Sequence, residues 1–284
     1  HFELFSSLLR LIESMNTKSL KVIHSLCRSF AIKVLGELTR SKCCLCRRGE
    51  VVATAFGGSI SLPHRLCPAC FNKLRQPILT GYLLVQEKPV PFFCAGAYEG
   101  IFQSLIHKIK YQGEAALCFD LAIVLDKLTG EFLKPEINYL LLPIPLHPKR
   151  RRERGYNQCE LLAKSLCRRK GKAALTYKPL LLRAKDTPPQ HSLTRQERIA
   201  NVKSVFALKK GAANTIKDRH VILLDDVLTS GATAHEAALL LLSAGAREVV
   251  VLTLARTIKK WDGLKTRPAP FETSALLGKG AHPP

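Results

Sequence analysis

The sequence predicts an α/β fold in which helices flank a parallel sheet, preceded by a small cysteine-rich module and a helix. In the C-terminal half, buried strands at 220–224 and 248–255 enclose a helix at 232–244 that Gly245 closes. A strand–helix–strand succession of this kind builds parallel sheets. Near the N-terminus, four of the 10 cysteines form two C-x-x-C pairs, so a separate module precedes the sheet domain.

The first 40 residues are expected to form two parts. Residues 1–14 precede Met15, the only methionine, and we expect them to lie upstream of the native start or to lack order. Residues 15–40 predict an amphipathic helix, because apolar residues recur at helical spacing opposite lysines and arginines. Packing of this helix on the next module is favoured over binding to a membrane surface. Apolar runs such as 140–146 are far shorter than the roughly 18 residues of a membrane span, which excludes a transmembrane helix.

Residues 41–76 form the cysteine-rich module and predict a zinc ribbon. Cys43 and Cys46 can present two thiolates from one turn, and Cys67 and Cys70 two more, which makes a tetrahedral four-sulfur site. With all positions filled by protein, the zinc is structural, and it supplies on the order of 10 kcal/mol to a module with little core. Unliganded thiols are the alternative, and Cys44 could compete with Cys43. The other cysteines are scattered, so a reduced, cytoplasmic protein is expected.

The stretch from residue 77 alternates linkers with expected helices and strands. Pro77, Pro89 and Pro91 mark a linker, and a basic loop is expected to run to Gly155. The remaining expected elements are helices at 100–110, 114–128 and 156–169, strands at 137–146 and 180–183, a polar loop at 185–201 and a disordered tail at 258–284.

The turn after the strand at 220–224 predicts a binding site for a ribose 5-phosphate group. Asp225 and Asp226 at a strand end can accept hydrogen bonds from vicinal ribose hydroxyls. The hydroxyl groups and backbone N–H groups that follow can surround a phosphate at a helix N-terminus, where the helix dipole favours negative charge. The residues of this loop are Thr229, Ser230, Gly231, Ala232 and Thr233. No G-K-[ST] follows, which excludes a Walker loop, and a single glycine excludes a dinucleotide fingerprint.

A second phosphate-binding element is expected in the basic loop after the strand at 137–146. Arginine side chains match phosphate oxygens, and a helix start adds a favourable dipole. The candidate pyrophosphate ligands are Arg150, Arg154, Gly155, Asn157 and Gln158. A solvated charge run and a nucleic-acid patch are alternatives for this segment, but its place at a strand end, in the same α/β domain as the first loop, favours pyrophosphate.

Two further segments are candidates for the edge of the cleft. The polar stretch between candidate strands could form a mobile hood that closes over the ligand and excludes water. Its residues are Gln190, Arg195, Arg198 and Asn201. Lys110, Tyr111 and Gly113 follow the helix at 100–110 and are also expected to line the cleft.

The loop at 225–233 resembles the phosphoribosyl pyrophosphate motif of type I phosphoribosyltransferases, although Ser230 stands where threonine is common. The resemblance implies that Asp225 and Asp226, as the catalytic residues, hold the ribose hydroxyls, that residues 229–233 bind the 5-phosphate, and that Mg²⁺ accompanies the ligand. The whole of residues 40–256 is similar to ComF/GntX-type proteins. The similarity is carried by the zinc ribbon, Y-E-G…H-K-I-K-Y-Q-G at 98–113, P-I-P-L-H-P…R-G-Y-N-Q at 143–158, the segment 190–206 and the D-D-V loop.

This resemblance implies a type I phosphoribosyltransferase-like domain over residues 90–257 and a link to DNA uptake in natural competence, without an established acceptor substrate. Two functions follow as hypotheses. The first is a phosphoribosyltransferase that releases pyrophosphate; the second is a non-catalytic nucleic-acid-binding or regulatory module whose partners are single-stranded DNA or the DNA-uptake machinery. A formal net charge of +22, from 44 Lys plus Arg against 22 Asp plus Glu, suits polyanionic ligands of either kind.

Overall fold

The computed structural model describes residues 41–48, 50–51, 65–171, 173–183, 205–258 and 266–268. The chain divides into two compact units, residues 1–68 and 69–284, and each is described by itself. The segment 1–14, the helix expected over 15–40 and the four hood residues lie outside the described ranges.

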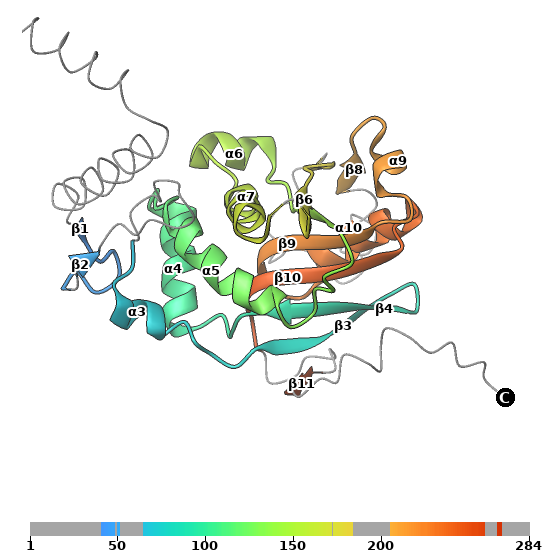
Figure 1. The fold of residues 1–284 in the computed structure, drawn as a ribbon. Coiled ribbons are helices and arrows are strands. Elements are labelled where there is room, and N and C mark those ends of the chain that lie inside the picture. The colour runs from blue at the N-terminus through green and yellow to red at the C-terminus, as the bar shows by residue number, and fades with distance from the viewer. Residues whose placement is uncertain are drawn as a thin grey trace, which may run out of the picture. The chain divides into compact units, whose positions relative to one another are not determined.

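In the described part of the second unit, seven strands form one sheet in the order β11-β3-β4-β10-β9-β5-β6 (Figure 1). From β4 to β6 neighbouring strands are parallel, whereas β3 and β11 are antiparallel to their neighbours. The strands are β3 (Leu79–Val85), β4 (Lys88–Cys94), β5 (Tyr139–Pro143), β6 (Leu175–Tyr177), β9 (His220–Leu228), β10 (Glu248–Arg256) and β11 (Thr266–Pro268). β11 lies within the segment 258–284, where the sequence predicts no order.

The central strands are apolar along both faces because helices cover both sides of the sheet. Val221 and Leu223 of β9 belong to the core that Ala237 of α10 also joins, while Ile222 and Leu224 point to the opposite face and are fully buried. On that face α5 packs against β10, and α7 packs against β5, β6 and β9. The predicted α/β fold, a parallel sheet flanked by helices, is confirmed.

The flanking helices follow the expected pattern closely. They are α4 (Gly100–Tyr111), α5 (Leu117–Thr129), α7 (Gln158–Lys170) and α10 (Ala232–Ser243), with the short helices α6 (Pro148–Arg154) and α9 (Ala212–Ile216) between strands. The strand expected at 180–183 is β7 (Leu181–Arg183), which pairs with β8 (Phe206–Leu208) in a separate antiparallel ribbon. The strand expected at 137–146 is shorter, since β5 ends at Pro143.

The linker predicted around Pro89 and Pro91 is wrong, because both prolines lie inside β4. β4 pairs with β3 along its length, and a two-residue turn with positive φ at Gln86 (48°) and Glu87 (65°) joins the two strands. β4 pairs with β10 only from Phe92 onward. Both prolines therefore precede the part of β4 that is paired on both sides, where a missing N–H would break the ladder.

The described part of the cysteine-rich module contains short elements only. These are β1 (Ser41–Lys42), which pairs antiparallel with β2 (Glu50–Val51), and α3 (Pro68–Asn72), where the division between the units falls. None of the helices in the described ranges is long and apolar enough to span a bilayer.

Candidate functional site

The candidate site is built around two acids at the carboxyl end of the central strand β9. The sequence predicts a strand that stops at Leu224, but β9 continues to Leu228, so Asp225 and Asp226 lie within it. β10 causes this extension, because its pairing with β9 runs on to Arg256 opposite Leu228. The acids remain at the edge of the sheet where ligands of open α/β folds bind.

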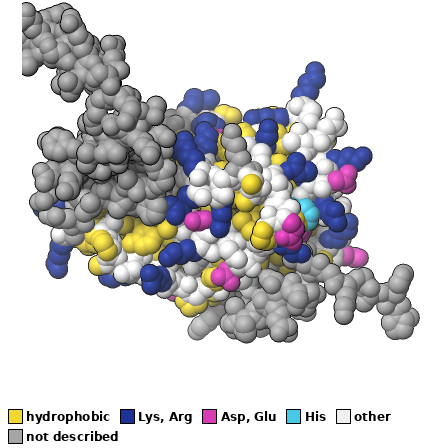
Figure 2. Space-filling model, in the orientation of Figure 1, with side chains coloured by type: hydrophobic (Ala, Val, Ile, Leu, Met, Phe, Trp, Pro, Cys, Tyr) yellow, Lys and Arg dark blue, Asp and Glu magenta, His cyan; other side chains and the backbone are white. Residues whose placement is uncertain are grey.

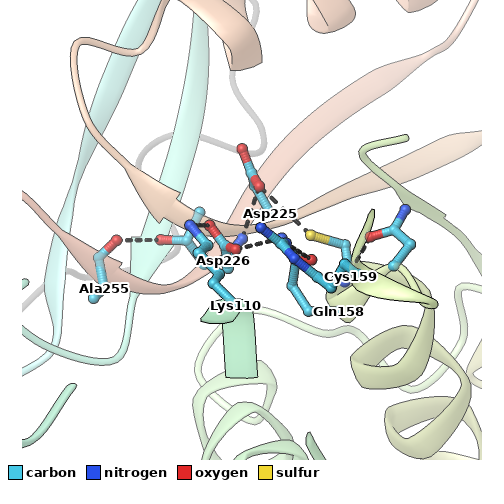
Figure 3. A network of polar contacts seen from close by, with 9 residues as sticks. Lys110, Gln158, Cys159, Asp225, Asp226 and Ala255 are labelled. Atoms are coloured by element: carbon cyan, nitrogen blue, oxygen red, sulfur yellow. Dashed lines mark hydrogen bonds and ion pairs between the residues drawn. The ribbon is translucent and has the colours of Figure 1, made fainter. Parts of the chain in front are cut away.

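Asp226 is held by two helices at once. Nζ of Lys110, at the end of α4, lies 2.7 Å from Oδ1 of Asp226, and Nε2 of Gln158, the first residue of α7, donates to Oδ2 at 2.5 Å (Figure 3). The Asp226 side chain is only 7% exposed and that of Lys110 20%. Burial acts to lower the pKa of Lys110, but the carboxylates of Asp226 and Asp225 outweigh it and raise that pKa. Lys110 therefore stays charged beside the acids.

Asp225 has a different environment, half-buried and next to a buried thiol. Its Oδ1 accepts hydrogen bonds from the backbone N–H of Asp226 at 2.8 Å and from Sγ of Cys159 at 3.5 Å. Burial, and then the neighbouring Asp226 carboxylate, raise the pKa of Asp225 to about 6. Burial and both acids raise the pKa of Cys159 well above its ordinary value, so its sulfur is a protonated donor.

The ligand atoms of Cys159, Asp225 and Asp226 lie within 4.8 Å of one another. Lys110 already brings a positive charge into this group, 2.7 Å from Asp226. We therefore assign no metal to these three side chains. The sequence predicted both acids and placed Gln158 among the pyrophosphate ligands, but it missed Cys159 and gave Lys110 only a place at the edge of the cleft.

The predicted phosphate loop turns from β9 into α10. Thr229 and Ser230 are exposed. Gly231 is the residue before α10, with φ of +78°, and within the described chain no side chain caps that helix end. The first N–H groups and the hydroxyl groups of the loop are thus open to an anion. A hollow of about 300 Å³ lies beside the loop, lined by Ser230, Gly231, Ala232 and His235 with Leu83, Leu84 and Glu236.

The predicted basic loop is wrong in its conformation, because residues 148–154 form the helix α6. Nδ1 of His147 caps the helix by accepting from the backbone N–H of Lys149, Pro148 occupies the first position, and Gly155, with φ of +80°, ends it. Proline at the start and glycine at the end are the usual helix boundaries. Because five of the seven residues are arginines or lysines, the sequence was interpreted as a charge run and its helical boundaries were missed.

The candidate pyrophosphate ligands do not all reach the acids. Arg154 donates to Oε1 of Gln158 at 2.5 Å and lies over the Tyr111 ring at 5.8 Å, so it joins the site through Gln158. Arg150 is exposed on α6 and, within the described residues, forms no hydrogen bond or ion pair with Asp225 or Asp226.

Asn157, also a predicted pyrophosphate ligand, is buried and caps α7. Its Oδ1 accepts from the backbone N–H of Cys159 at 2.9 Å, and its Nδ2 donates to the carbonyl oxygen of Ile144 at 2.9 Å. Both ends of its side chain are therefore used to fix the start of the helix that carries Gln158 and Cys159.

The four cysteines of the two C-x-x-C pairs lie together, with their sulfur atoms within 4.8 Å of one another. Sγ of Cys46 lies 3.8 Å from Sγ of Cys67. Burial acts to raise the pKa of Cys43, but backbone N–H groups, that of Cys46 first among them, lower it overall. A lowered thiol pKa and four converging sulfurs fit a structural zinc ion. Cys44 is buried but does not belong to the group.

Comparison with known proteins gives several relatives, although no family model matches the chain. The chain is 30% identical over 240 residues to competence protein ComFC of Bacillus subtilis, covering 84% of this chain and 85% of that protein. It is 34% identical over 167 residues to competence protein F of Haemophilus influenzae, covering 57% and 70%. It is 31% identical over 208 residues to the DNA utilization protein YhgH of Escherichia coli K12, covering 68% and 85%.

Among solved structures, a hypoxanthine phosphoribosyltransferase of Trypanosoma cruzi matches 56% of this chain and 70% of its own at 15% identity, with a TM-score of 0.31. A similarity of that size carries no information on activity.

Proposed function

The chain belongs to the ComF family, and on that premise we propose that it binds phosphoribosyl pyrophosphate together with Mg²⁺ at the carboxyl end of β9. One observation carries the proposal: a half-buried carboxylate, Asp225, lies on the strand that leads into α10, and no described side chain caps the N-terminus of that helix. A sugar phosphate presents hydroxyl groups and a phosphate at a short separation, and this arrangement offers an acceptor for the first and N–H donors for the second.

In this proposal each group of the ligand has its own partners. The hydroxyl groups of Thr229, Ser230 and Thr233 and the N–H groups of the loop bind the 5-phosphate, and Asp225 accepts from the ribose. Arg154 and the hood bind the pyrophosphate end. Mg²⁺ would neutralise the pyrophosphate charge and so favour its departure.

We further propose that the protein transfers the phosphoribosyl group to a nitrogen nucleophile, an amine or a nucleobase. The bond between the ribose C1 and pyrophosphate oxygen breaks, a bond from C1 to the acceptor nitrogen forms, and the acceptor loses a proton. Positive charge develops on the ribose in such a transfer, so nearby carboxylates favour it electrostatically. The raised pKa of Cys159 keeps this residue a thiol, which speaks against a covalent intermediate on it.

The names of the relatives support a role for this proposed activity in competence and DNA use. A second candidate function, a non-catalytic module that binds nucleic acid or regulates its uptake, is favoured by the basic surface of α6. Lys149, Arg150, Arg151 and Arg152 are exposed there, and Lys and Arg side chains gather over that helix (Figure 2). Such a surface suits a phosphate backbone.

A titration of phosphoribosyl pyrophosphate with Mg²⁺ tests the first proposal by calorimetry, with a parallel assay of pyrophosphate release in the presence of candidate acceptors. We expect the wild type and the control Glu136→Ala, an exposed acid outside the site, to bind alike, and Asp225→Ala/Asp226→Ala to lose binding. Binding without release for every acceptor would count against catalysis. No binding by the wild type would overturn the proposal. Steeply salt-dependent binding of single-stranded DNA that is lost in Arg150→Ser/Arg152→Ser would favour the second function.

A further inference from the structure

The two neighbouring acids at the end of β9, Asp225 and Asp226, differ in the hydrogen bonds that their carboxylate oxygens accept. Asp226 has a donor on each carboxylate oxygen: the ammonium group of Lys110 at 2.7 Å on Oδ1, and the amide of Gln158 at 2.5 Å on Oδ2. In Figure 3, by contrast, one oxygen of Asp225 points out of the network, and no dashed line reaches it. From this difference we infer that Asp225 alone accepts a hydrogen bond from a hydroxyl group of the sugar. Asp226 is instead a positioning residue that Lys110 and Gln158 hold in place, and we call these two contacts the lock on Asp226. The inference rests on the proposed function.

The lock on Asp226 leaves little room for another donor. Lys110 and Gln158 come from the ends of two different helices, α4 and α7, so Asp226 ties both to the central strand. Each carboxylate oxygen can accept two hydrogen bonds, but the Asp226 side chain is only 7% exposed, so a sugar hydroxyl could reach it only by disturbing the two donors already bound. Charge-assisted bonds are about twice as strong as neutral ones, and breaking a buried pair leaves an uncompensated charge. The hydroxyl therefore binds Asp225, where no pair has to be broken.

The orientation of Gln158 follows from its two neighbours. Arginine can only donate and an ionised carboxylate can only accept, so the amide oxygen faces Arg154 and the amide nitrogen faces Asp226. The guanidinium group of Arg154 thereby fixes the amide that holds Asp226. Lys110 of α4 therefore holds the Asp226 carboxylate directly, and Arg154 of α6 holds it through Gln158.

Exposure, rather than the face of the strand, distinguishes the two acids. Successive residues of a strand point to opposite faces. Both faces of β9 are buried here, because Ile222 and Leu224 on the face of Asp226 and Val221 and Leu223 on the face of Asp225 are all fully buried. Asp225 is nonetheless the more exposed of the two acids.

Two probes separate the roles: inorganic phosphate, which the loop alone binds, and ribose 5-phosphate, which adds the hydroxyl contacts. The ratio of their affinities measures what the hydroxyl contacts contribute. We expect Asp225→Asn to reduce that ratio roughly tenfold, the value of one hydrogen bond to a charged group. The double variant Lys110→Met/Asp226→Asn removes both charges of the lock together, and we expect it to retain the wild-type ratio within about threefold.

A ratio that collapses in the double variant as far as in Asp225→Asn would overturn the inference while leaving the proposed function intact. A wild-type ratio near one would overturn the proposed function, and the assignment of Asp225 with it. In that case the melting temperatures of the variants alone test whether Lys110 holds Asp226 in place.

A second experiment compares the melting temperatures of single and double variants. We expect Lys110→Met to lower the melting temperature by about 5–10 °C because it leaves a buried carboxylate without its cation. Lys110→Arg, which keeps the charge, and the double variant should each recover much of that loss. The control is Lys108→Met on the same helix, where the ammonium group bonds the exposed Gln112. Equal losses in Lys108→Met and Lys110→Met, or no recovery in the double variant, would exclude the lock.

Discussion

Asp225 is the residue at which the proposed function and folding stability conflict. It is half-buried beside a second carboxylate, and its pKa is raised to about 6 from an ordinary value near 3.8. A raised pKa means that the folded state binds the proton more tightly than the unfolded chain does. Ionisation of Asp225 therefore costs folding free energy, which a ligand-binding carboxylate must accept in order to present a charged acceptor.

The sign of this effect gives a pH prediction. Between about pH 4 and 6 the folded state holds more protons on this group than the unfolded state does, so its contribution makes the protein less stable as pH rises through that window. Above pH 6 the penalty is constant at about 3 kcal/mol. We expect Asp225→Asn to be more stable than the wild type at pH 7.5 and equal to it near pH 4, measured by urea unfolding at both values. A variant that gains as much at pH 4 as at pH 7.5 would contradict the assigned titration.

The residues of the site were predictable from the sequence only where they are neighbours along the chain. Asp225, Asp226 and the loop that follows form one contiguous pattern whose chemistry can be interpreted without a structure. Lys110, one of the two partners of Asp226, lies 116 residues away, and Cys159 lies 66 residues from Asp225. Contacts at such separations depend on how helices are placed on the sheet, and a sequence pattern does not encode that placement locally.

Among the elements, the turn from β9 into α10 is the one with the tightest steric demand. Gly231 has φ of +78°, and a Cβ atom there would lie 2.8 Å from Cδ2 of Leu83 on β3. Residues with a side chain rarely adopt this backbone conformation, and a 2.8 Å contact forces the neighbour to move. The loop that is proposed to bind phosphate therefore requires glycine for two separate reasons.

Gly231→Ala tests both reasons when it is compared with Gly211→Ala. Gly211 also has positive φ, +76°, but a Cβ atom there meets nothing within 4 Å. We expect Gly211→Ala to cost about 1 kcal/mol from backbone strain alone and Gly231→Ala about 1–2 kcal/mol more, both measured by urea unfolding. In the double variant Leu83→Ala/Gly231→Ala, the part of the destabilisation that comes from the contact between the new Cβ atom and Leu83 should disappear. Equal costs at the two glycines would show that Leu83 yields freely.

Elements were predicted well where periodicity and boundary residues agree. The strand–helix–strand succession of β9, α10 and β10 has long apolar runs, and Gly245, with φ of +86°, follows the C-cap residue Ala244. The β3–β4 hairpin was missed because its two prolines indicate a linker, and the turn at Gln86–Glu87 lacks the glycine or asparagine that usually marks such a turn. In that hairpin, pairing with neighbouring strands overrides local preference.

Across the whole molecule, the sheet order explains why the site could be located from the sequence although its contacts could not. β9 is central, between β10 and β5, and its carboxyl end lies at the edge where parallel strands of this sheet finish together. The fold class and this edge follow from apolar patterning. Which helix ends converge there, those of α4 and α7, follows from packing of α5 against α7 and α4 against α5. The apolar faces of α4, α5 and α7 are too similar in sequence to predict which helix packs against which.

The cysteine group gives a prediction for the remaining module, whose described part contains only two-residue strands and one short helix. So little regular structure buries a small core, and the metal is expected to supply the deficit, on the order of 10 kcal/mol. We expect one zinc per chain by elemental analysis. We expect Cys43→Ser to lose it, and chelation to open the module to trypsin at Arg47, Arg48 and Arg65. Cys44→Ser is the matched control, since Cys44 is also buried and adjacent but outside the group of four. Loss of zinc in Cys44→Ser, or a chelated protein that still resists trypsin at these arginines, would exclude this assignment and leave the module to be stabilised by packing alone.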